Sequence, residues 1–439
     1  MYFAFFTFAA YSEHLHVFTI PTVIKSSYSG EIVGPHLWLT TRSPDPVHVS
    51  VSLPGIDYAN DVILTRGDPL DITLPETPGS YPGVRLQAPG KSNKTIIVRS
   101  SDKVTVYVAD EACCGVAFLI LPAEHLGTEY YVAAYVPHDF PSFFVVSALG
   151  QTTAVNFVTQ TGQAHAIVLD PYESYRYEAS EDLTSTRVTS DQPISVTSGV
   201  ISRVPVGWEK YGGLIVNLVP ADQWGQNFVI APYLSSTPCG YVYRILSCNQ
   251  STIVTISGSV GSTPLTHNLS AQEFYEGDVE DDTMITIAAD QPVSVMKYMK
   301  SKNSCGRGAP TLVIVPPIES TYTNVTFPVI DIAYRYGTTY NNINVIIKCD
   351  LVDGLRLGTS SMAGWDRLST ADNSTCAVRG EVDSGIHSVV HTNPLASFTV
   401  SAYIMTDGWY FYGHAYQIEY VPIRGGYLLK LKQAVMYQN

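Results

Sequence analysis

Clusters of acidic and histidine side chains are the first places to look for chemistry in this sequence. Glu276–Asp282 holds five carboxylates in seven residues, and oxygen ligands of this kind suit a hard cation such as Ca²⁺. No calcium-loop spacing is matched, so we interpret the segment as a solvated acidic loop between two strands. His14 with His16, and His387 with His391, lack the further ligands that a metal centre needs. We predict no metal site and no cofactor.

Sequence motifs of catalysis are also missing. The chain has no Gly-x-Ser-x-Gly elbow, His-Glu-x-x-His motif, Cys-x-x-Cys pair or phosphate-cradling glycine loop. It carries 25 basic and 39 acidic residues, and no run of Lys or Arg exceeds two. A basic stripe that could follow a phosphate backbone is therefore absent. We predict a protein that is not an enzyme and binds no nucleic acid.

Sequons and cysteines indicate the compartment. Seven cysteines and five N-x-S/T sequons favour a secreted, extracellular chain. No segment approaches the ~18–20 apolar residues of a membrane span. The predicted glycosylation sites are Asn93, Asn249, Asn268, Asn324 and Asn373.

Cysteine spacing predicts two disulfides. Cys239 and Cys248 flank one predicted strand, whose length of about 30 Å exceeds the ~7 Å limit for a disulfide. A simple meander instead brings Cys248 to the end of its unit where Cys305 lies, whereas a Greek-key crossing would swap the strand ends. We predict Cys248–Cys305, and Cys349–Cys376 as a strand-to-strand link. With seven cysteines, at least one is left over or pairs with another chain.

Aromatic residues in loops mark the candidate binding surface. Trp208, Lys210 and Tyr211 lie in the long segment Val200–Gly213, which we predict as the candidate binding loop. Trp224 follows a proline-ended strand, and we predict that it packs at a junction between units.

A period of about one hundred residues organises the elements that carry these groups. Two unrelated landmarks keep this period. One is a turn followed by an alternating strand, with prolines at Pro193, Pro292 and Pro394. The other is an apolar run closed by proline, at Pro122, Pro220, Pro316 and Pro422. Two landmarks with one period predict four tandem repeats.

Short β-branched and aromatic runs between turn residues predict an all-β fold. We predict four antiparallel β-sandwich-like repeats, spanning residues 13–124, 125–223, 224–320 and 321–422. Short linkers predict that the repeats pack as a stiff array, and the alternative is a closed, propeller-like ring. The Asp-Gln-Pro phrase is expected to turn a hairpin between Ser185–Thr189 and Ile194–Ser198.

The two ends of the chain lie outside the four predicted repeats. Residues 1–12 include an apolar run that is either a signal peptide or the first strand. The run resembles a signal peptide, but the basic residues that usually begin one are missing. Residues 423–439 are expected to form a C-terminal tail.

Four phrases in order along the chain resemble the IgGFc-binding protein N-terminal domain family. They begin with Leu-Gly-Thr-Glu-Tyr-Tyr-Val-Ala-Ala-Tyr at residues 126–135 and continue at residues 182–199, 217–229 and 407–413. The resemblance implies a secreted or surface binding protein of mucus-like secretions, not an enzyme. The chain departs from the family in lacking a Cys pair in Val200–Gly213 and an appended von Willebrand D domain. Antibody-Fc binding is not carried over, because no motif here maps onto it.

We therefore expect a secreted or cell-surface recognition or adhesion protein that binds a glycoprotein or mucin-like partner. One alternative is lectin-like glycan binding, which requires an exposed, flat aromatic shelf. A secreted glycan hydrolase is a further alternative, and it requires two carboxylates at roughly 5–10 Å in a cleft.

Overall fold

The computed structural model describes residues 14–21, 34–75, 83–110, 116–202, 212–300 (except 236, 239, 259, 260 and 262), 310–329, 339–406 and 413–417. The expected N-terminal segment 1–12 and the tail 423–439 lie outside these residues. Almost every described element is a β-strand, and the described helices are short 3-10 turns. Within these ranges no helix is long and apolar enough to cross a membrane. The predicted all-β fold is confirmed.

The first unit is a sandwich of two four-stranded antiparallel sheets, with strand orders β1-β7-β3-β4 and β5-β2-β8-β9. Side chains alternate along β3 between buried and more exposed positions, so one face of its sheet enters the core. The elements of this unit are β1 (His14–Phe18), β2 (His36–Thr41), β3 (Val47–Leu53), η1 (Pro54–Ile56), β4 (Tyr58–Leu64), β5 (Leu70–Thr73), β6 (Gly90–Ser92), β7 (Ile96–Ser100), β8 (Val104–Asp110) and β9 (Val116–Ile120).

The second unit repeats this plan, but one long strand joins its two sheets. The first half of β15 pairs with β10 and β12, and its second half pairs with β11 and β16. β6 from the first unit adds to the edge of this unit at β14. The elements are η2 (Ala123–His125), β10 (Gly127–Tyr131), β11 (Ser142–Ala148), β12 (Thr153–Val158), β13 (Ala164–Leu169), β14 (Ser174–Ala179), β15 (Arg187–Ser202) and β16 (Gly212–Asn217).

The third unit has the same connections, with β22 as its long shared strand. Its elements are η3 (Ala221–Gln223), β17 (Gly225–Ile230), β18 (Tyr241–Ser247), β19 (Thr252–Ser257), β20 (Leu265–Leu269), β21 (Phe274–Val279), β22 (Ile285–Met299) and β23 (Thr311–Ile314).

The fourth unit returns to two separate sheets, with strand orders β24-β30-β26-β27 and β28-β29-β25-β31-β32. Its elements are β24 (Asn324–Val329), β25 (Thr339–Lys348), η4 (Cys349–Gly354), β26 (Leu355–Leu357), β27 (Ser360–Ser361), β28 (Asp366–Ser369), β29 (Thr375–Glu381), β30 (Gly385–His391), β31 (Thr399–Thr406) and β32 (Gly413–Gln417).

The Asp-Gln-Pro phrase does not turn a hairpin, and this expectation was wrong. Asp191 and Pro193 lie within the continuous strand β15. The Asp191 carboxylate accepts a hydrogen bond from the backbone N–H of Ala154 at 2.9 Å, and Asp290 does the same for Ile253 at 2.8 Å. The phrase therefore marks the point where one strand crosses between two sheets, a place where proline's missing N–H is tolerated.

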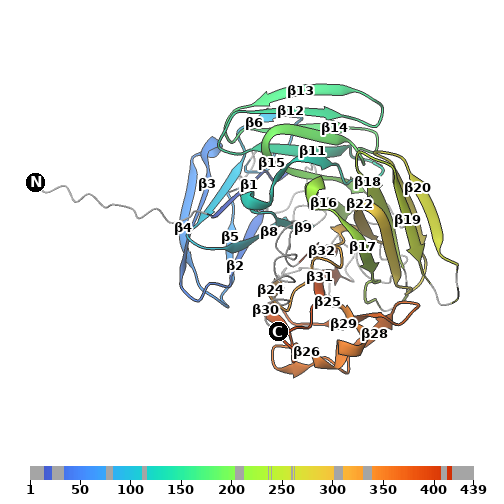
Figure 1. The fold of residues 1–439 in the computed structure, drawn as a ribbon. Coiled ribbons are helices and arrows are strands. Elements are labelled where there is room, and N and C mark those ends of the chain that lie inside the picture. Colours follow the sequence, from blue (N-terminus) through green and yellow to red (C-terminus); the bar gives the residue numbers. More distant parts are fainter. Residues whose placement is uncertain are drawn as a thin grey trace, which may run out of the picture.

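The four units close into a ring (Figure 1), with the first in blue, the second in green, the third in yellow and the fourth in orange. The last strand of each unit lies innermost. β16 contacts β9 and β23, and β32 contacts β23 and β9, so the contacts return from the fourth unit to the first. The arrangement is thus the ring-shaped alternative and not an open array. The apolar, proline-ended runs form the described strands β9, β16 and β23 of this hub.

Hydrophobic clusters cross the boundaries between units. Phe143 and Ile215 of the second unit join the core of the first, and Tyr107 and Ala117 of the first unit join the core of the fourth. Burial of apolar surface is the main force that holds such contacts together. Each unit therefore completes its neighbour's core, and the contact between the fourth and first units closes the ring.

Candidate functional site

The hub brings the ends of equivalent strands together. A Cβ atom at Gly212, which begins β16, would lie 1.8 Å from the carbonyl oxygen of Pro310, which directly precedes β23. Only glycine fits this close backbone approach. The start of β16 and the residue that precedes β23 therefore lie side by side at the hub.

The candidate binding loop precedes β16 in the sequence. Trp208, Lys210 and Tyr211 lie outside the described residues, between the end of β15 and the start of β16. Their attachment to the hub follows from the two flanking strands.

The predicted glycosylation sites all lie on exposed parts of the described chain. Asn93, Asn249, Asn268, Asn324 and Asn373 are each solvent-exposed. Asn373 has a positive φ of 56°, which a residue of this type tolerates in a tight turn. Each side chain is thus accessible to modification.

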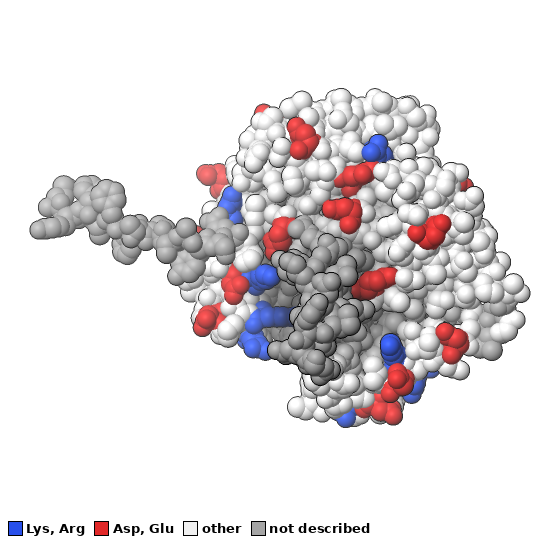
Figure 2. Space-filling view, in the orientation of Figure 1, with Lys and Arg blue, Asp and Glu red and all other residues white. Residues whose placement is uncertain are grey.

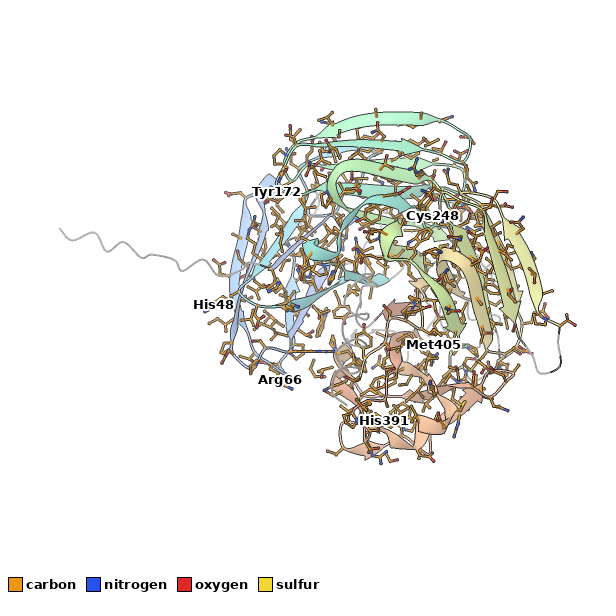
Figure 3. The ribbon with its side chains drawn as sticks, viewed as in Figure 1. His48, Arg66, Tyr172, Cys248, His391 and Met405 are labelled. Carbon is orange, nitrogen blue, oxygen red and sulfur yellow. A yellow bond between two sulfur atoms is a disulfide. The ribbon has the colours of Figure 1, made fainter. Side chains whose placement is uncertain are left out.

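The two predicted disulfides have different outcomes. Cys349 and Cys376 form a disulfide that ties η4 to β29, with their Cα atoms 4.8 Å apart. Cys248 has a free thiol, so the predicted pairing with Cys305 was wrong; Cys305 itself lies outside the described residues. The Cys248 thiol lies 3.6 Å from the Tyr131 hydroxyl, where the second and third units meet (Figure 3). The side chain points towards the neighbouring unit, which the strand pattern of one unit does not reveal.

The acidic segment is not a simple solvated loop. Glu276 accepts a hydrogen bond from the Arg244 guanidinium at 2.8 Å, and Asp282 accepts one from Arg379 at 3.2 Å. Asp278 forms an ion pair with Lys300. Three of its carboxylates therefore neutralise basic side chains that are themselves buried.

A buried arginine joins the second unit to the third. The Arg244 side chain is 3% exposed and lies on β18. Its Nη1 donates to Asp182 at 2.8 Å and to the Ala134 carbonyl at 3.3 Å, both in the second unit. Buried charges are tolerated when they are paired and hydrogen-bonded in this way.

Aromatic rings enclose the same guanidinium. The Arg244 carbon Cζ lies 4.2 Å from the centre of the Tyr135 ring and 4.5 Å from that of Phe274. Tyr298 donates its hydroxyl to the Ala134 carbonyl at 2.7 Å. The interface is filled with side chains, and cation–π contacts add to its ion pairs.

Arg379 has the corresponding role between the third and fourth units. It lies on β29, and its Nη1 donates to the Pro232 and Tyr233 carbonyls at 3.4 and 3.3 Å. Asp366 of its own unit accepts from its Nε at 2.7 Å, and Asp282 of the third unit is a further partner.

A second basic side chain is buried beside it. Lys297 Nζ donates to the Ala231 carbonyl at 2.6 Å and lies 3.2 Å from the centre of the Tyr233 ring. Burial lowers the pKa of Lys297 well below its ordinary value, and the nearby Arg379 charge lowers it further, while Asp282 acts in the opposite direction. Among the described residues, Lys297 has no carboxylate within ion-pair distance.

Lys297 lines a cavity of about 50 Å³ between the third and fourth units. Tyr233 and Asn344 also line it, together with Ser401 and Tyr403 of β31. The Tyr233 hydroxyl is buried and has no hydrogen-bond partner in the described part of the chain. Burial also raises the pKa of this hydroxyl, so it remains a neutral donor.

Histidine pairs that could suggest a metal have other contacts. His387 Nε2 lies 2.6 Å from the Asp383 carbonyl, and His391 Nε2 lies 2.6 Å from the Leu351 carbonyl. Across the described ranges, no group of three or more His, Cys, Asp or Glu side chains is arranged to hold a metal ion.

The surface carries few charges. On the face shown in Figure 2, most of the described surface is uncharged, and acidic and basic side chains lie singly or in small mixed groups. Every Phe, Trp and Tyr side chain whose burial the structure describes is buried or only partly exposed, including Trp365, whose ring packs against Gly380. An exposed aromatic shelf of the lectin type is therefore not found in the described part.

Sequence reasoning missed the buried basic residues Arg244, Lys297 and Arg379. Each occupies an inward position in an otherwise apolar strand, where basic residues are rare unless they are paired. This signal was present in the sequence, but Asp182 and Asp282, which pair with Arg244 and Arg379, lie in neighbouring units.

The sequence of this chain is similar to known proteins of one family. The sequence pattern of the family described as IgGFc binding protein matches residues 116–403. The human IgGFc-binding protein is 22% identical over 314 residues, which make up 65% of this chain and 5% of that protein. The chain thus spans about one twentieth of that relative. A solved tetra-tandem repeat from the extending region of a large adhesion protein aligns with 94% of this chain and 99% of its own, at 10% identity and a TM-score of 0.10, which carries no argument about the fold.

Proposed function

The chain belongs to the IgGFc binding protein family, and from this premise we propose that it is a secreted, non-enzymatic module that binds another extracellular protein. The family match over residues 116–403 is the observation that carries the proposal. The proposed partner is a glycoprotein or mucin-like protein, and the setting is recognition or adhesion.

Features of the extracellular environment support this proposal. The Cys349–Cys376 disulfide suits an oxidising compartment. Sequon asparagines are accessible on the described surface, which suits N-glycosylation in a secreted chain.

The hub supports a location for the binding surface. The shared cores and buried arginines make the ring a stiff scaffold, and binding residues are disproportionately found on loops that a rigid scaffold positions. We therefore propose that Trp208, Lys210 and Tyr211, which precede β16 in the sequence, contribute to the partner-binding face.

A binding experiment tests the proposal. The chain is produced in a mammalian secretory system, and its binding to purified mucin, immunoglobulin G and a glycan array is measured. We expect saturable binding to a glycoprotein that falls at least about tenfold in a Trp208→Ala/Tyr211→Ala double variant, because aromatic anchors dominate interface energies. The matched control is Trp365→Ala, which should leave binding unchanged. Binding to free glycans alone would support the lectin alternative, and turnover of a glycan would contradict the non-enzymatic function.

A further inference from the structure

We propose that the cavity between the third and fourth units binds one small monovalent anion, of the size of chloride, bromide or formate. Lys297 and Tyr233 would hold the anion, and the residues of β31 would form the opposite wall. The cavity lining contains none of the residues Trp208, Lys210 and Tyr211 that we propose for partner binding.

The hydrogen-bond groups around the cavity favour an acceptor ligand. Two carbonyl acceptors at the cavity are already engaged: Ala231 accepts from Lys297, and the adjacent Pro232 accepts from Asn344 and Arg379. The side-chain oxygen of Asn344 accepts from the Tyr403 hydroxyl at 3.0 Å.

Donors, in contrast, remain available. The Tyr233 hydroxyl has no partner among the described residues, and a protonated Lys297 has three donors of which the Ala231 carbonyl takes one. The Lys297 nitrogen lies above the Tyr233 ring, so one small ligand can reach both groups. A buried donor without an acceptor is unfavourable, and an anion supplies acceptors for both.

The balance of charge leads to the same ligand. Asp282 and Asp366 are bound to Arg379, whereas Lys297 has no carboxylate within ion-pair distance in the described chain. An anion in direct contact with Lys297 would offset the desolvation of its ammonium group and favour the protonated form in a buried site.

Cavity size limits the ligand. A volume of about 50 Å³ has room for one small ion such as a halide or formate. Because Lys297 belongs to the third unit and Ser401 to the fourth, a bound anion would stabilise the contact between these units.

Crystallography with bromide locates the ligand directly. Crystals of the whole chain grown in sodium bromide should give an anomalous difference peak within hydrogen-bond distance of Lys297 Nζ and Tyr233 Oη. The peak should be lost in Lys297→Met and weakened in Tyr233→Phe, which keeps the ring. No peak in the cavity, or an undiminished peak in both variants, would overturn the proposal.

Thermal unfolding shows whether the site is occupied in solution. At constant ionic strength, replacing gluconate by about 0.1 M chloride or bromide should raise the unfolding midpoint by about 2 °C, because a ligand stabilises the state that binds it. Lys297→Met and Tyr233→Phe should lose this shift. Lys300→Met is the matched control: it removes a buried lysine on the same segment outside the cavity lining, and it should retain the shift. A bromide peak without a halide-specific shift would indicate an adventitious ion only and would contradict the proposal.

Discussion

The interface between the second and third units and that between the third and fourth units each contain a buried arginine, but in different surroundings. In both, a buried arginine donates to backbone carbonyls that follow the first strand of the preceding unit: Arg244 to Ala134, and Arg379 to Pro232 and Tyr233. These carbonyls leave the sheet ladder there and need other donors. The arginine thus satisfies the backbone at the junction.

The two interfaces differ in what surrounds the arginine. Tyr135 and Phe274 stack on Arg244, and Trp224 packs against Tyr131 nearby with ring centres 5.4 Å apart. The second interface instead has a cavity and Lys297, which has no carboxylate partner among the described residues. Well-packed rings stabilise a fixed contact, whereas a cavity with unsatisfied donors leaves the contact open to modulation by a ligand.

The largest effect is expected from Arg244→Met. It removes the guanidinium donor from Asp182, whose side chain is only 17% exposed, and one of the two donors of the Ala134 carbonyl; breaking such a buried pair costs about 3–5 kcal/mol. Arg379→Met should cost about 2 kcal/mol, because Asp366 and Asp282 have side chains that are 45% and 30% exposed and regain water. Urea unfolding of both variants measures the difference. Equal costs would show that the two arginines are not distinguished by their surroundings.

Trp224→Ala tests the packing of the first of these interfaces. The Trp224 side chain is buried in a cluster that contains residues of both units, so its loss should cost about 3 kcal/mol. Hydrogen exchange should also become faster in β10 and β17. Trp365→Ala, in the fourth unit, is the control and should leave exchange in these strands unchanged. If Trp224→Ala alters neither stability nor exchange, its role at the junction is wrong.

Local features of the fold could be predicted from the sequence. The period and the alternation of apolar residues gave the all-β class and the strand-rich units, because each unit contains its own turns and strand pattern. The Cys349–Cys376 pairing also depended only on neighbouring strands of one unit. Such properties depend on sequence patterns within about one hundred residues of chain.

Contacts between units could not be predicted from the sequence in the same way. The period fixes the number of units but not their curvature, so it did not distinguish a ring from an array. Glu276 and Asp282 were interpreted as solvated because their partners Arg244 and Arg379 lie far away in sequence or on another strand. The Asp191 phrase resembled a hairpin turn, since a strand that crosses between two sheets needs the same residue types as a turn.

Acid should weaken the interface between the first and second units, through His16. β1 contacts β11 and β15 of the second unit, and both ring nitrogens of His16 are buried without partners in the described chain. Burial, with smaller contributions from the neighbouring His14 and His125, lowers the pKa of His16 from 6.5 to about 3. Between these values the unfolded chain binds a proton that the folded chain does not, so stability falls as the pH drops below 6.5.

At pH 5 the His16 contribution amounts to a loss of about 2 kcal/mol relative to pH 7.5. His16→Leu should remove that part of the pH dependence, whereas His48→Leu, at an exposed position on β3, should not. Urea unfolding at the two pH values measures the change. An unaltered pH dependence in His16→Leu would contradict the assignment.

The smallest expected effect on stability distinguishes two tyrosines that contact each other between the third and fourth units. The rings of Tyr233 and Tyr403 lie 4.8 Å apart, but their hydroxyls differ. Tyr403 donates to Asn344 at 3.0 Å and accepts from the Leu234 N–H at 2.6 Å, so Tyr403→Phe should cost about 1–2 kcal/mol. Tyr233→Phe removes a hydroxyl without a described partner, and in halide-free buffer it should leave the free energy of unfolding unchanged or slightly raise it. Parallel urea unfolding of the two variants decides, and an equal loss in both would show that the Tyr233 hydroxyl has an acceptor even without an anion.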